Sequence, residues 1–134
     1  MNSIENAVIT AAYNALQPKY PGIKVYSDAT AVSATFPCVS IYEIDNALAS
    51  DTYDTSRREK YSDATYQVDV YSNLEQGRKD QCKNIIAIID EMFVGYGLER
   101  ASMVPTPNAN DSNIYRITAR YSARIGYDNT IYRR

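Results

Sequence analysis

The feature that most restricts the fold is an alternation of apolar and polar side chains that runs along most of two segments, residues 60–71 and 114–125. Because successive side chains of a β-strand point to opposite faces, this period of two predicts two half-buried strands. At roughly 3.3 Å per residue each strand would be about 40 Å long, whereas a compact chain of this size has a diameter near 36 Å. Two interpretations are equally open: the strands reach a neighbouring subunit, or a bulge or bend folds them back.

Two helices are predicted by apolar side chains at helical spacing. The first covers residues 4–16. The second carries an apolar stripe from Cys82 to Phe93, with Ser72 and Glu75 as a capping box at its start and Gly95 and Gly97 at its end. Shorter apolar runs at 23–26, 38–44 and 98–104 predict three more strands.

The two remaining segments are polar. Residues 45–60 have no apolar periodicity and lie between two predicted strands, so we expect the tip of a long hairpin there. Residues 127–134 form a short C-terminal tail.

These elements predict one α+β domain that spans residues 1–134, in the order α-β-β-β-α-β-β. The short and hairpin-like connections favour a mostly antiparallel sheet of four to five strands. Both helices would pack on one face of this sheet, and the long hairpin would protrude from it.

The residues that usually perform catalysis are scarce. The chain has no histidine, no glycine-rich phosphate loop and no Gly-x-Ser-x-Gly motif. We therefore predict that the protein is not an enzyme, with no catalytic residues, no cofactor and no metal site. If a small-molecule pocket existed, Asp69 and Glu43 on central strands would be the carboxylates to examine, although solvated or paired acids are the favoured interpretation. Cys38 and Cys82 are expected to be buried thiols.

No run approaches the roughly 20 apolar residues that span a bilayer, and the N-terminus shows no signal-peptide pattern. We expect no membrane partner and synthesis in the cytoplasm.

Charge is distributed unevenly along the chain. From Asn113 onward, five Arg and one Asp give +4, and the rest of the chain carries −6. This asymmetry is typical either of a nucleic-acid-binding tail or of the two complementary halves of a head-to-tail subunit contact.

Three arginines of the last long strand, Arg116, Arg120 and Arg124, share one face. They could form an inter-subunit surface or face DNA phosphates. The favoured alternative is pairing with Asp63 and Asp69 on the polar face of another strand.

Tyrosine is abundant, with thirteen residues against two Phe and no Trp. Tyrosine is enriched at protein interfaces but also in strands. Tyr53, Tyr127 and Tyr132 lie in polar segments, so the interface explanation suits them better.

The element order and several short sequences at strand edges resemble one family, the tail terminator (tail completion) proteins of long-tailed phages and phage-derived tail particles. The resemblance covers nearly the whole chain and is carried by Tyr20–Tyr26 (YPGIKVY), Phe36–Tyr42 (FPCVSIY), Tyr66–Ser72 (YQVDVYS), Gly77–Lys79 (GRK) and Tyr115–Tyr121 (YRITARY).

The resemblance implies a structural virion protein in the tail or neck, made in the host bacterial cytoplasm. Such subunits form a ring, usually a hexamer, at the head-proximal end of the tail tube. The ring ends tube polymerisation and offers the surface for head–tail joining. The implied partners are the subunit itself, the tube protein, the head connector and, in contractile tails, the sheath protein. DNA passes through the lumen without sequence recognition.

On this basis, three surfaces are assigned by hypothesis. The 45–60 excursion contacts a neighbouring subunit or the tube through Tyr53, Arg57 and Arg58. The tail from Tyr127 docks on an adjacent subunit through Tyr132 and Arg134. The arginine row forms an inter-subunit or lumen surface.

Three alternatives remain. The first is another neck or head-closure accessory subunit. The second is a small-molecule-binding or catalytic α+β domain, and the third is an adaptor that pairs a strand edge with a peptide and is monomeric alone.

Overall fold

The computed structural model describes residues 4–28, 36–48, 61–106, 113–126 and 131–132. These residues form two helices and six strands: α1 (Glu5–Leu16), β1 (Lys24–Tyr26), β2 (Cys38–Leu48), β3 (Tyr61–Ser72), α2 (Arg78–Tyr96), β4 (Glu99–Pro105), β5 (Tyr115–Gly126) and β6 (Ile131–Tyr132).

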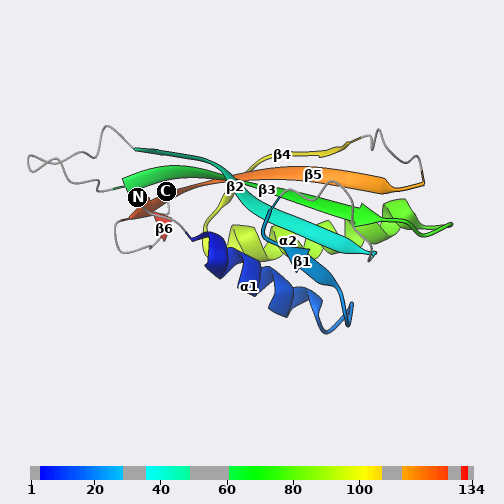
Figure 1. Ribbon diagram of the computed structural model, residues 1–134. Coiled ribbons are helices and arrows are strands. Elements are labelled where there is room, and N and C mark those ends of the chain that lie inside the picture. Colours follow the sequence, from blue (N-terminus) through cyan, green and yellow to red (C-terminus); the bar gives the residue numbers. More distant parts are fainter. Residues whose placement is uncertain (1–3, 29–35, 49–60, 107–112, 127–130, 133–134) are drawn as a thin grey trace, which may run out of the picture.

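A single sheet lies on one side of the molecule, and both helices lie beneath it (Figure 1). The strand order is β1-β2-β3-β5-β4, and β6 pairs with β5. All neighbours are antiparallel except β1 and β2. The predicted α+β class, its mostly antiparallel sheet and the order α-β-β-β-α-β-β are confirmed. The two-residue strand β6 was not predicted.

The two alternating segments form the centre of the sheet. β3 and β5 contain twelve residues each and pair in one register from Tyr61–Gly126 to Ser72–Tyr115. The interpretation in which a bulge folds these strands back is therefore wrong. Bulges occur instead in β2, between Glu43 and Asp45, and in β4, between Arg100 and Ser102.

The hydrophobic core lies between the sheet and the two helices. The apolar stripe of α2 packs on β3 and β5, and the rings of Phe93 and Tyr121 meet edge to face with their centroids 4.9 Å apart. Tyr66 and Tyr121 are fully buried, so these two tyrosines serve the core. No helix in the described part of the chain is long and apolar enough to cross a membrane.

The predicted start of the second helix is wrong. β3 continues through Ser72, and α2 begins at Arg78 after Gly77, whose φ of 84° is left-handed. Because Ser72 still belongs to the strand, its hydroxyl donates to the Gln81 side chain instead of capping the helix. At the other end, α2 passes Gly95 and is capped by Gly97, with φ of 103°.

The predicted hairpin tip is too long at its first end. Asp45–Leu48 belong to β2, because the bulge at Ile44 lets the strand keep pairing with β3 as far as Ser62. The strand continues through the polar residues Asp45 and Asn46, so a search for apolar periodicity ended it too early. Residues 49–60 lie outside the described residues.

Candidate interaction surface

The face of the sheet opposite the helices is polar and carries one buried carboxylate. Asp69 is 1% exposed. Its Oδ1 accepts hydrogen bonds from Arg116 Nε (3.1 Å), Arg116 Nη2 (3.0 Å) and Thr118 Oγ1 (2.7 Å). Its Oδ2 accepts from the Tyr42 hydroxyl (3.2 Å) and Gln67 Nε2 (3.1 Å). Both oxygens are saturated by donors, so Asp69 holds three strands together rather than serving as a proton acceptor.

Two tyrosines border this carboxylate. The Arg116 guanidinium lies 5.4 Å from the ring centroid of Tyr71. Burial, reinforced by the Asp69 charge, raises the pKa of Tyr71 to about 12, although Arg116 partly opposes the shift. Burial and Asp69 also raise the pKa of Tyr42. Both hydroxyls therefore stay protonated near neutral pH, and that of Tyr42 donates to Asp69.

The other two members of the arginine row also bond across to β3. Arg124 pairs with Asp63 through Nε–Oδ1 at 2.8 Å and Nη2–Oδ2 at 3.1 Å, while Arg120 Nε donates to Gln67 Oε1 at 3.1 Å. The predicted pairing with Asp69 and Asp63 is confirmed for Arg116 and Arg124, whereas Arg120 bonds to Gln67 instead. The role of the row at an inter-subunit or lumen surface stays a prediction.

Glu43 takes part in a hydrogen-bond network that links β2 to β3 and to the start of α1. Its Oε1 accepts from the Tyr66 hydroxyl (2.9 Å) and from Asn46 Nδ2 (3.2 Å). The Tyr66 hydroxyl in turn accepts from the Ile4 amide, and Glu5 Oε2 accepts from the Glu43 amide at 2.7 Å. These bonds tie the start of α1 to β2 and β3, which supports the interpretation of Glu43 as a paired acid.

Both cysteines are buried free thiols, as expected. Burial raises the pKa of Cys82 to about 12, and its Sγ lies 3.5 Å from the Tyr115 carbonyl oxygen. The thiolate, which is the reactive form, is therefore not populated at Cys82 near neutral pH.

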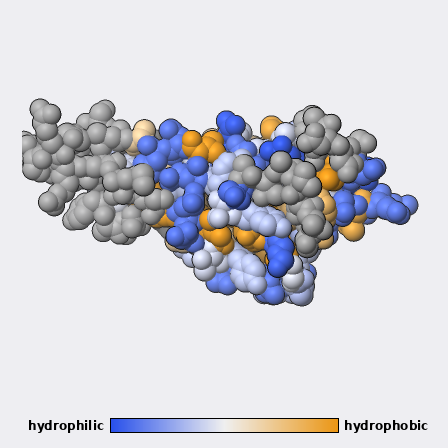
Figure 2. Space-filling view, viewed as in Figure 1, coloured by the Kyte–Doolittle hydropathy of each residue, from blue (hydrophilic) through white to orange (hydrophobic). Residues whose placement is uncertain are grey.

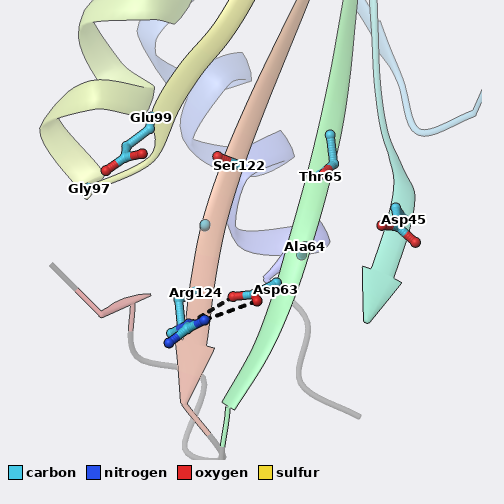
Figure 3. Close-up of a pocket in the computed structure, with 9 residues that line it drawn as sticks. Asp45, Asp63, Ala64, Thr65, Gly97, Glu99, Ser122 and Arg124 are labelled. Carbon is cyan, nitrogen blue, oxygen red and sulfur yellow. Dashed lines mark hydrogen bonds and ion pairs between the residues drawn. The ribbon is translucent and has the colours of Figure 1, made fainter. Parts of the chain in front are cut away.

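A small polar hollow of about 170 Å³ lies at one end of the sheet. In Figure 3 the Asp63–Arg124 pair joins two neighbouring strands at one end of the group of lining residues, with Asp45 to one side and Glu99 to the other. Hydroxyls of Thr65 and Ser122 also line it. Three carboxylates and one guanidinium give the hollow an acidic character, yet in the described ranges no group of side chains is arranged to hold a metal ion.

A second, more apolar groove of about 330 Å³ runs between α2 and β4. Its walls and rim are formed by Lys83, Ile86, Ala87, Asp90, Arg100, Met103, Val104, Pro105 and Ile117. Sequence reasoning missed this groove. The pattern of residues 98–104 predicts a strand, but it does not reveal that the strand lies at a sheet edge beside a helix. On the side of the molecule shown in Figure 2, hydrophobic residues appear in separate small areas among polar ones.

The predicted contact residues of the two polar segments are mostly not described. Tyr53, Arg57, Arg58, Tyr127 and Arg134 lie outside the described residues. Tyr132 lies in β6, where its backbone pairs with Arg124 of the same chain. At this residue the tail is therefore attached to its own sheet.

Comparison with known proteins adds no family assignment. No protein-family model matches the chain, and a search of curated proteins finds no match.

Proposed function

We propose that the protein is a structural subunit that forms a ring at the head-proximal end of a phage tail tube. The ring would end tube polymerisation and provide the surface for head–tail joining. The observation that carries this proposal is the β3–β5 pair, which runs twelve residues in one register within the element order that the resemblance implies. Strands of this length give a subunit a stiff sheet that reaches from one side of the domain to the other.

The chemistry of the described residues also favours a structural role. The buried carboxylate Asp69 has donors on both oxygens, and Glu43 accepts two side-chain hydrogen bonds. A general base needs a lone pair aimed at a substrate in a concave site. In the described part of the chain these acids are instead directed at their neighbours in the fold.

The proposal is tested by mass and by microscopy. Light scattering gives the mass of the protein alone and after mixing with purified tail tubes, and electron microscopy of the mixture locates the bound protein. We expect a ring-sized species or density that caps one end of the tube. A protein that stays monomeric and ignores tubes contradicts the proposal and favours the adaptor or pocket alternatives. Binding to isolated head connectors but not to tubes would favour a head-closure subunit.

A charge-reversal variant tests the predicted contact segment. Arg57→Glu together with Arg58→Glu should weaken ring formation or tube capping and leave the fold intact, because both residues lie in the segment predicted to reach a neighbour. The matched control reverses two exposed lysines elsewhere, Lys24 and Lys79. Sedimentation measures assembly, and circular dichroism measures the fold. Equal assembly of the two variants would show that Arg57 and Arg58 make no such contact.

A further inference from the structure

We propose that neighbouring copies of this chain join head to tail, with Ile44 of one copy seated in the groove between α2 and β4 of the next. This inference rests on the proposed ring and names the two surfaces that would build it.

The receiving surface is the apolar groove. Ile86 and Ala87 of α2 line one wall, and Met103 of β4 lines the other. Val104 borders the groove and is 52% exposed, but it pairs with Thr118, whose hydroxyl bonds to Asp69, so its side chain lies on the polar face of the sheet. β4 is the last strand on its side of the sheet path, and in the described ranges its outer edge pairs with no further strand. A groove with apolar walls beside such an edge is suited to receive an apolar side chain from another chain.

The inserted group is the exposed isoleucine at the bulge of β2. Ile44 is 40% exposed and is skipped by the pairing register, which passes from Glu43–Tyr66 to Asp45–Thr65. β1 covers β2 only from Cys38 to Ser40. Among the described strands, none pairs with the outer edge of β2 at Ile44, so the exposed isoleucine lies beside an unpaired strand edge.

The charges around the two surfaces are complementary. Three charged residues line the groove: Lys83, Arg100 and Asp90. Asp90 pairs with Arg100, so the charge of Lys83 is left over and the groove has one net positive charge. Asp45, beside Ile44, is exposed. An acidic residue next to the inserted isoleucine would therefore meet a basic rim, which favours this orientation of approach.

The positions of the two surfaces determine the kind of assembly. β2 and β4 lie on opposite sides of the central β3–β5 pair. A contact between two different patches is heterologous, so a bound pair still offers one free groove on one copy and one free isoleucine on the other. Repetition of such a contact closes into a ring or continues as a filament, whereas an isologous contact would stop at a dimer.

The first test compares two matched substitutions. Ile44→Asp should weaken assembly at least about tenfold, because it removes the apolar side chain from the groove. Leu74→Asp is the control, since Leu74 is 42% exposed, lies between β3 and α2, and belongs neither to the lining of the groove nor to the bulge of β2. Ala87→Trp fills the groove and should also weaken assembly. Sedimentation on tubes or in solution measures the effect, and circular dichroism confirms the fold of each variant.

Mixing the variants tests the head-to-tail geometry. The Ile44→Asp variant keeps an intact groove, and the Ala87→Trp variant keeps an intact isoleucine. Their mixture should form dimers that grow no further, although each variant alone stays monomeric. A mixture without dimers would overturn the inference.

Cross-linking gives a positive signal that does not depend on loss of assembly. The natural thiols Cys38 and Cys82 are buried, so introduced surface thiols can be observed separately. Under mild oxidation, Ile44→Cys mixed with Ala87→Cys should yield a covalent dimer, and Leu74→Cys mixed with Ala87→Cys should not. If the wild-type protein assembles and Ile44→Asp assembles as well as Leu74→Asp, the Ile44 contact is wrong, but the proposed ring still stands. If the wild-type protein assembles neither alone nor on tubes, the proposed ring and the Ile44 contact are both wrong.

Discussion

The buried carboxylate on the polar face permits a sharp prediction about stability. Asp69 is 1% exposed, and the Arg116 side chain that pairs with it is 25% exposed. Asp69→Ala leaves the guanidinium and the Thr118 hydroxyl without their acceptor. Removal of one partner from a buried ion pair costs about 3–5 kcal/mol. Because Arg116 can still reach water, we expect the lower end, about 3 kcal/mol.

The expected shift in melting temperature follows from the chain length. For a chain of 134 residues, an unfolding entropy of roughly 2.1 cal/mol/K per residue makes each kcal/mol worth about 3.5 °C. Asp69→Ala should therefore lower Tm by about 10 °C. Urea unfolding followed by circular dichroism provides the free energy, with the m-value checked to be unchanged.

A matched control lies on the same two strands. Asp63 pairs with Arg124 at 2.8 Å, but its side chain is 50% exposed. Since exposed ion pairs contribute at most about 1 kcal/mol, Asp63→Ala should have a small effect. The reasoning attributes the difference to burial and to the number of donors on each carboxylate. Equal losses for the two variants would refute it.

Two further predictions concern the helix ends and alkaline pH. Gly95→Ala should stabilise the protein by about 0.5–1 kcal/mol, because Gly95 lies inside α2 with no atom within 4 Å of an added Cβ. Gly77→Ala should destabilise it by about 1–2 kcal/mol, because the left-handed φ of 84° at this position disfavours a side chain. Thermal unfolding measures the stability of both variants. A lower stability of Gly95→Ala would contradict the prediction for Gly95. Burial raises the pKa of Tyr71 in the folded chain to about 12, against 10.0 for an unburied tyrosine. The stabilising effect of the protonated hydroxyl is therefore complete below pH 10 and is lost as pH rises toward 12. Tyr71→Phe should flatten this decline in urea unfolding measured against pH, and an unchanged decline would exclude Tyr71 as its source.

The long strands could be predicted from the sequence because alternation is a local pattern. The side chains of residues 114–125 predict a two-faced strand, whatever lies beside it. The observed ends of β3 and β5 differ from the predicted ends by one residue. The same local charge pattern favoured pairing of Arg116 and Arg124 with Asp69 and Asp63, which the register between the strands brings about.

Other features depend on partners far away in the sequence, and local patterns missed them. Ser72 has the residue type of a helix cap, but pairing with Tyr115 keeps it in β3. Ile44 looked like the last apolar residue before a polar loop, whereas pairing with β3 carries β2 past it and leaves a bulge. The groove beside Val104 exists only because β4 is an edge strand next to α2.

Arg120 can separate the two predicted roles of the arginine row. Arg116 and Arg124 face carboxylates within the chain, whereas Arg120 is exposed and bonds to the neutral Gln67. The positive charge of Arg120 is therefore still available to pair with an acidic group of another subunit or with a DNA phosphate. If the row lies between subunits, Arg120→Glu should weaken assembly. If the row lines the lumen, the variant should assemble normally and bind DNA with a smaller salt dependence, because one phosphate contact per subunit is lost. Normal assembly together with unchanged DNA binding would remove both roles and leave the row as an internal feature of the sheet.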